Sequence, residues 1–86
     1  MTIVTMRYWA AAKEAAGTSE EKIYADTLAT ALDVVRGKRE GDSRFANVLA
    51  RSSFLVDSNP VGRRAADTIL LPEGAVIEVL PPFAGG

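Results

Sequence analysis

The sequence predicts an α+β domain in which a mixed sheet has one main helix packed on one face. Three observations support this prediction. Residues 2–9 and 75–80, near the two ends of the chain, have the β-branched, aromatic and apolar composition of strands. Residues 28–35, between them, carry the one strong helical pattern of apolar side chains. With 86 residues that are 48% hydrophobic, the chain has enough apolar surface for one core and too little length for two.

The first predicted strand, residues 2–9, has two unlike faces because alternate side chains of a strand point to opposite sides of a sheet. The more apolar face, which we assign to the core, carries Val4, Met6 and Tyr8. The opposite face carries Ile3, Thr5, Arg7 and Trp9.

Two short elements are expected between this strand and the main helix. Residues 10–17 are mostly alanine and end in a glycine suited to a left-handed helix C-cap, so we expect one or two helical turns there. Residues 19–25 contain Lys22 and two glutamates, a composition typical of a polar edge strand.

The main helix is predicted to begin after a cap at Asp26 or Thr27 and to end near Gly37. Its apolar stripe, at the spacing of one helix face, consists of Leu28, Ala31, Leu32 and Val35. The charged stretch 38–44 is expected to be a loop, and residues 45–49 a further short helical piece. We expect the basic side chains of this region to be exposed to solvent. They are Arg36, Lys38, Arg39 and Arg44.

The last predicted strand, residues 75–80, has apolar side chains on both faces, as expected of a central strand buried on both sides or nearly so. Glu78 is the exception, and Arg7 is its expected cross-strand partner. A short strand at 54–56 and a turn at 57–60 precede it. A hairpin, a helix and a returning strand place the N- and C-terminal strands parallel at the centre of the sheet, which is the β-grasp, or ubiquitin-like, arrangement.

The residue types that are absent exclude several kinds of chemistry. Without cysteine there is no thiolate nucleophile or zinc knuckle, and without histidine there is no Ser-His-Asp triad, so we expect neither a metal site nor ordinary side-chain catalysis. Ten basic and eleven acidic side chains give a net charge of -1, which argues against a nucleic-acid partner.

No apolar run approaches the roughly 20 residues that span a bilayer. Because the first residues also lack the features of a secretory signal, we expect a cytoplasmic protein without a membrane partner.

The candidate functional site is the tail 81–86, which we separate from a domain formed by residues 1–80. The tail consists of Pro81, Pro82, Phe83, Ala84, Gly85 and Gly86. Proline has no amide hydrogen, so the first two residues end the sheet pairing and stiffen the exit. The last two have no side chain and fit a slot too narrow for other residues. We interpret the tail as a probe that inserts into another protein. The alternative is a frayed terminus with an incidental pair of glycines.

Both ends of the sequence resemble the MoaD/ThiS family of ubiquitin-like sulfur carriers, and most closely the small subunits of molybdopterin synthase. The matching pieces are residues 6–10 (MRYWA), 12–17 (AKEAAG) and 79–86 (VLPPFAGG). Their order and spacing agree over nearly the whole chain. The sequence departs from the family in having Ala75 where an aspartate is usual before the last strand. It also has a longer, arginine-bearing stretch after residues 57–60, where the family has an Asn-Gly-like turn.

The resemblance implies a specific chemistry at the carboxylate of Gly86. An adenylyltransferase related to ubiquitin-activating enzymes would use ATP to convert this carboxylate to an acyl-adenylate, and a persulfide donor would replace AMP to leave a thiocarboxylate. Inserted into the large subunit of molybdopterin synthase, the thiocarboxylate would donate its sulfur to the pyranopterin precursor as molybdopterin forms. The resemblance further implies that this chain is a non-catalytic subunit that binds no cofactor. The catalytic residues would lie on the large subunit.

Two other functions would use the same C-terminal tail. The same carrier chemistry could serve thiamine or cysteine synthesis, and a ubiquitin-like modifier would be joined through Gly86 to lysines of other proteins.

Several side chains have two interpretations. Trp9 is expected either to anchor the large subunit or to pack beneath the helical turn that follows it. Phe83 is expected to be an interface anchor. Arg7 is a candidate for the partner interface, with a surface ion pair to Glu78 as the simpler account. The arginines at 63–64 are expected in a solvated loop, with acidic groups on a partner as the alternative.

Overall fold

The structure is a computed structural model, and it describes residues 2–82. Met1 and the predicted tail residues Phe83, Ala84, Gly85 and Gly86 lie outside the described residues. The elements in chain order are β1 (Ile3–Tyr8), α1 (Ala10–Ala16), β2 (Glu20–Tyr24), α2 (Leu28–Gly37), α3 (Ser43–Arg51), β3 (Ser53–Val56), β4 (Asn59–Pro60), the 3₁₀ helix η1 (Ala66–Thr68) and β5 (Val76–Leu80).

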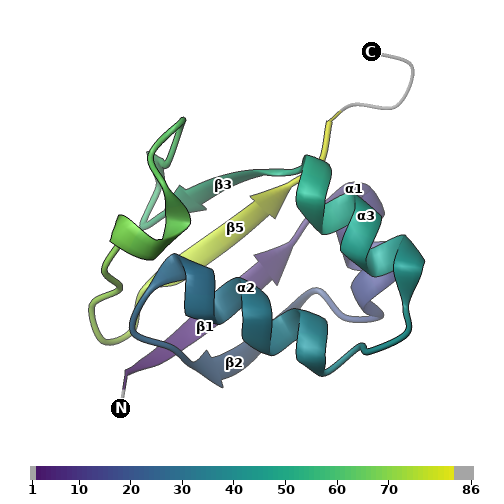
Figure 1. Cartoon of the computed structure of the whole chain (residues 1–86), viewed down its shortest axis with the longest axis horizontal. Coiled ribbons are helices and arrows are strands. Elements are labelled where there is room, and N and C mark those ends of the chain that lie inside the picture. The colour runs from purple at the N-terminus through teal and green to yellow at the C-terminus, as the bar shows by residue number, and fades with distance from the viewer. Residues whose placement is uncertain (1, 83–86) are drawn as a thin grey trace.

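Within residues 2–82, five strands form one mixed sheet in the order β2-β1-β5-β3-β4 (Figure 1). The two central strands, β1 and β5, are parallel, and the other neighbours are antiparallel. This is the predicted β-grasp arrangement, with β2 at one edge as expected. Because β1 and β5 run in the same direction, the end of β1 and the end of β5 lie together at one rim of the sheet.

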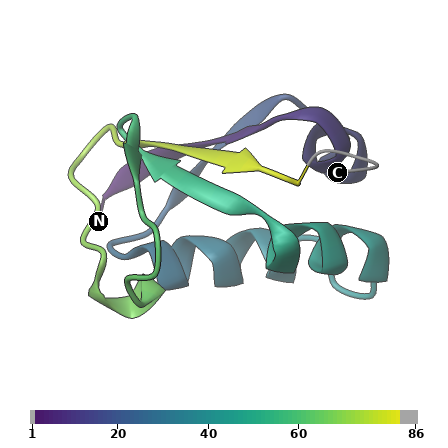
Figure 2. The same ribbon diagram turned by 90° about the horizontal axis from the view of Figure 1, so that it is seen from above.

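The main helix α2 packs on one face of the sheet, as predicted, and α3 lies on the same face: Figure 2 shows both helices below the strands. The expected piece at 45–49 is therefore too short, since α3 has nine residues. Asp42 is its N-cap, with a carboxylate that accepts a hydrogen bond from the backbone N–H of Phe45 at 2.9 Å. The cap was hidden from sequence analysis because Asp42 stands in a run of charged residues that reads as loop.

The core between these helices and the sheet contains the side chains that the alternation and the helical stripe predict. Val4, Met6 and Tyr8 are buried, and so is the α2 stripe, which consists of Leu28, Ala31, Leu32 and Val35. Thr27 is the cap of α2, since its hydroxyl accepts from the N–H of Thr30 at 3.1 Å. The expectation for β5 holds on one face only: Ile77 and Val79 are buried, whereas the other face is half-buried.

Two turns set the positions of the neighbouring elements. Gly17 has a φ of 80° and ends α1, as the sequence predicts. The β3–β4 hairpin is closed by Asp57 and Ser58, with φ of 48° and 70°. Positive φ at both loop residues is the requirement of a type I′ turn, and aspartate tolerates positive φ better than most non-glycine residues.

None of the helices within residues 2–82 combines the length and the apolar character that a membrane crossing requires.

Candidate functional site at the exit of the central strand

The predicted tail leaves the sheet from the end of β5, at the rim where β1 also ends. The backbone N–H of Trp9 donates to the carbonyl of Val79 at 3.3 Å, and Ser53 is the register partner of Leu80 on the other side. Strand pairing stops at Leu80, as the prolines predict. The exit is therefore bordered by α1, which follows β1, and by the end of α3, which precedes β3 (Figure 1). Pro81 is half-buried and Pro82 is exposed.

Trp9 lies beside this exit, immediately before α1, and its side chain is 46% exposed. Its indole Nε1–H donates to Glu78 Oε1 at 3.2 Å, which holds the ring against the uncovered face of β5. Trp9 and Lys13 also line a shallow hollow on the side of α1. The indole is thus anchored at its polar end while Trp9 stays partly exposed beside the exit of β5. Its role as an anchor for a partner stays a prediction.

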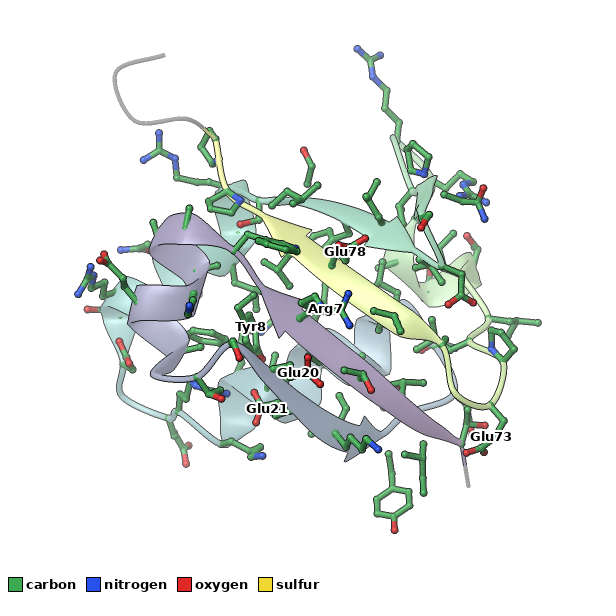
Figure 3. The ribbon with its side chains drawn as sticks, turned by 180° about the vertical axis from the view of Figure 1, so that it is seen from behind. Arg7, Tyr8, Glu20, Glu21, Glu73 and Glu78 are labelled. Carbon is green, nitrogen blue, oxygen red and sulfur yellow. The ribbon has the colours of Figure 1, made fainter. Side chains whose placement is uncertain are left out.

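Arg7 lies on the same uncovered face, between β2 and β5 (Figure 3). It is the register partner of Glu78, as predicted, but the predicted ion pair with that carboxylate is wrong. Arg7 Nε lies 3.6 Å from Glu20 Oε1 on β2, and Glu78 accepts from Trp9 instead. Since β1 is flanked by a strand on each side, Arg7 has two possible acidic partners, and alternation along one strand cannot choose between them.

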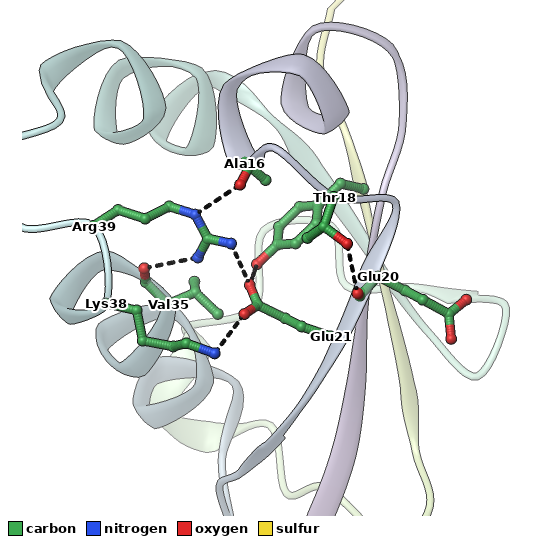
Figure 4. A network of polar contacts seen from close by, with 8 residues as sticks. Ala16, Thr18, Glu20, Glu21, Val35, Lys38 and Arg39 are labelled. Atoms are coloured by element: carbon green, nitrogen blue, oxygen red, sulfur yellow. Dashed lines mark hydrogen bonds and ion pairs between the residues drawn. The ribbon is translucent and has the colours of Figure 1, made fainter.

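Sequence analysis missed a polar network around the carboxylate of Glu21. It joins strands β1 and β2 to the end of α1 and to the residues that follow α2 (Figure 4). Tyr8 Oη donates to Glu21 Oε2 at 2.5 Å, Lys38 Nζ lies 2.6 Å from Oε1, and Arg39 Nη2 lies 2.8 Å from Oε2. Arg39 also donates to the carbonyls of Ala16 and Val35.

The guanidinium of Arg39 is enclosed by apolar and aromatic groups as well. Its Cζ lies 4.6 Å from the centre of the Phe45 ring and 5.6 Å from that of Tyr8, which is cation–π geometry. The side chain is only 14% exposed. The expectation that the basic side chains of this region are all solvated is therefore wrong for Arg39.

The network shifts the pKa of two of its members. Burial, reinforced by the neighbouring Glu21 carboxylate, raises the pKa of Tyr8 far above its ordinary value, so the phenol stays neutral. Burial opposes ionisation of Glu21, but the hydrogen bonds from Lys38, Tyr8 and Arg39 outweigh it and lower the pKa of this carboxyl. The group is therefore a neutral phenol that donates to a carboxylate held by two cations.

This network contacts α1, the helix that borders the tail exit. Arg39 donates to the carbonyl of Ala16 in the last turn of α1, and Trp9 is the N-cap residue at its other end. One signal in the sequence could have revealed the network. In the predicted β2, Glu21 alternates with Ile23 on the core side, and an inward-facing carboxylate needs a charged partner.

Comparison with known proteins identifies the family to which the chain belongs. Residues 6–86 match the model of the ThiS family. No curated protein is similar enough in sequence to be matched to the chain.

Several solved structures share the fold. Small archaeal modifier protein 1 from Methanosarcina acetivorans has a TM-score of 0.82 and 22% identity, over 100% of this chain and 98% of that chain. A putative molybdopterin converting factor, subunit 1, from Pyrococcus furiosus has a TM-score of 0.77 and 19% identity, over 96% and 100%. A complex of subunits 1 and 2 of the molybdopterin-converting factor from Helicobacter pylori contains a chain with a TM-score of 0.69 and 21% identity, over 99% and 100%. At these identities the structural likeness shows the β-grasp fold, and the family match, which covers nearly the whole chain, shows that the protein belongs to the ThiS family of ubiquitin-like sulfur carriers.

Proposed function

We propose that this protein is the small, sulfur-carrying subunit of a molybdopterin synthase and works through the carboxylate of Gly86. The observation that carries the proposal is the family match over residues 6–86, because it includes the whole predicted tail together with the β-grasp body. The division into a domain of residues 1–80 and a tail of residues 81–86 is part of the same proposal.

The proposed chemistry begins with activation of an unreactive group. The Gly86 carboxylate attacks the α-phosphate of ATP on a separate adenylyltransferase, which releases pyrophosphate and forms an acyl-adenylate. The terminal sulfur of a persulfide on a donor protein then attacks the acyl carbon, and AMP leaves. A thiol of the donor system breaks the remaining S–S bond, which leaves the thiocarboxylate on Gly86 and a disulfide on the donor.

The second half of the proposed cycle takes place in the large subunit. The thiocarboxylate sulfur attacks the pyranopterin precursor, and hydrolysis of the acyl–sulfur bond returns the Gly86 carboxylate. The general acids and bases for these steps are assigned to the large subunit, since this chain contains no histidine or cysteine. Trp9 and Arg7, on the uncovered face beside the exit, are proposed contacts for that subunit.

The test uses the full chain, its activating enzyme, a persulfide donor and a large subunit. We expect activation to raise the mass of the C-terminal peptide by the difference between one sulfur and one oxygen. Deleting Gly86, or adding one residue after it, should abolish sulfur transfer and leave the unfolding curve unchanged. Product formation by either variant would reject the mechanism. Replacing the pyranopterin precursor by the acceptors of thiamine or cysteine synthesis separates this pathway from the alternative carriers.

The second candidate is a protein modifier, which the likeness to small archaeal modifier protein 1 favours. In that case, the C-terminal peptide isolated from cells would be attached through an isopeptide bond to lysines of other proteins. Mass spectrometry of the native peptide separates the two functions, because the carrier gives the sulfur-for-oxygen shift and the modifier gives branched peptides.

A further inference from the structure

A small pocket opens at the sheet edge far from β2, beneath the segment that follows the β3–β4 hairpin. Its volume is about 250 Å³, and it lies between the start of α2, the start of β3 and residues 61–66. Figure 2 shows this segment descending from the hairpin to the helix layer, beside the beginning of α2. Pockets for small molecules measure roughly 300–1,000 Å³, so this pocket suits one side chain better than a metabolite.

Arg64 gives the pocket its charge, and its guanidinium is held in place by the backbone. Nε donates to the carbonyl of Val61 and Nη2 to that of Pro60, both at 3.0 Å. These bonds use two of the five N–H donors of the group and leave three. Among residues 2–82 no carboxylate lies within ion-pair distance of Arg64. The free donors are therefore pre-organised for an anion that the described part of the chain does not supply.

The other residues that line the pocket favour one kind of anion. Leu28, Phe54 and Val61 provide an apolar wall, and Ser53 provides a hydroxyl. A carboxylate carried on one or two methylene groups matches both the fork of donors and this wall. Phosphate polymers are a poorer match, because they need an extended basic face and the chain has a net charge of -1.

Arg64 is the basic side chain that lines the pocket. Residues 58–66 include Arg63 and Arg64 and no acidic residue, and both arginines are exposed, as the sequence predicts. The run is flanked by Asp57, which accepts the backbone N–H of Val76 at 2.9 Å, and by Asp67. Arg64 therefore belongs to a solvated stretch and also lines a pocket, with three N–H donors left for an anion.

We propose that this pocket binds a glutamate or aspartate side chain from an acidic segment of a partner protein, with Arg64 as the residue that holds the carboxylate. Ser53, which pairs with Leu80 at the exit of β5, also lines the pocket, whereas Trp9 does not. Binding of a carboxylate by Arg64 requires no thiocarboxylate, so its test can fail or succeed whatever the sulfur chemistry.

The test is a titration of the ¹⁵N-labelled full chain with a short peptide of alternating glutamates and leucines, followed by NMR. We expect saturable shifts of the backbone amides of Gly62 and Arg64 and of the Arg64 Nε–H. A peptide with glutamine at each glutamate is the matched probe and should bind at least about tenfold more weakly, because the charge-assisted hydrogen bonds are lost.

Two variants with the same change in net charge make the test specific. Arg64→Gln should weaken binding of the glutamate peptide by about tenfold or more, whereas Arg63→Gln should change it less than about threefold. Circular dichroism and the unfolding midpoint of both variants show that the fold is intact, and Arg64→Lys tests whether the planar fork is needed. Equal effects of the two Gln variants, equal binding of the glutamine peptide, or no binding of the glutamate peptide would each overturn the proposal. Stronger shifts of the same amides with an oligonucleotide would overturn it as well.

Discussion

The two faces of the sheet have different compositions, and β5 shows the difference within five residues. Ile77 and Val79 are completely buried under α2 and α3. Val76, Glu78 and Leu80, on the opposite face, are half-buried, and neither α2 nor α3 lies over them. The covered face is apolar, whereas the uncovered face carries the Trp9–Glu78 hydrogen bond next to the exit of the strand. One face therefore supplies stability, and the other is the face that we propose as the contact surface for a partner.

The largest expected effect comes from the covered face. Ile77→Ala should lower the free energy of unfolding by about 2–5 kcal/mol, because it removes a fully buried side chain and leaves a cavity. Its neighbour provides the control: Val76→Ala, on the uncovered face, should cost about 1 kcal/mol or less. Urea unfolding of the two variants measures both values. Similar losses for the two would mean that the faces do not differ in the way described.

The Glu21 network should give the next largest effect. Arg39→Met should lower the free energy of unfolding by about 2–3 kcal/mol, somewhat less than breaking a fully buried ion pair, because Glu21 keeps its bonds to Lys38 and Tyr8. Arg36→Met removes an equal charge from the exposed pair with Asp33 and should cost less than about 0.5 kcal/mol. A small change for Arg39→Met would show that the network adds little to stability.

The same network should make stability depend on pH at both extremes. The pKa of Glu21 is lowered by folding, so its contribution is present above the ordinary glutamate pKa of about 4.3 and is lost as the pH falls through and below that value. The pKa of Tyr8 is raised by folding, so its contribution is lost as the pH rises above the ordinary tyrosine pKa of about 10. Urea unfolding across the pH range measures both slopes.

Tyr8→Phe should flatten the alkaline slope, and Glu21→Gln the acidic one. Either variant with an unchanged slope would assign that pH dependence to other groups.

The smallest effect on stability is expected at the uncovered face. Trp9→Ala should lower the free energy of unfolding by about 1 kcal/mol, since the indole is nearly half exposed, yet weaken binding to the large subunit by at least about tenfold. Tyr24→Ala removes another exposed aromatic, from edge strand β2, and should leave binding unchanged. Calorimetric titration against the purified large subunit distinguishes them. Equal binding by the two variants would remove Trp9 from the proposed interface.

Local patterns were enough to predict the elements whose residues pack in a regular period. The alternation of Val4, Met6 and Tyr8 identified the core face of β1, and the α2 stripe gave a helix with its cap and its end. The predicted tail followed from the prolines and glycines, since these residues restrict or free the backbone without help from neighbours.

Other features depended on which elements become neighbours. Arg7 pairs with Glu20 and not Glu78, Arg39 packs against two aromatic rings, and α3 extends from a cap inside a charged run. Each of these requires contacts between residues far apart in the sequence. A strand pattern says which side a residue faces but not which strand lies beside it. The sequence by itself thus determined β1, α1, β2, α2 and β5 and the resemblance to the family, whereas the tertiary structure decided the extent of α3 and the partners of the charged side chains. The physical reason is that backbone preferences act over a few residues, while ion pairs and cation–π contacts form only after distant segments have packed.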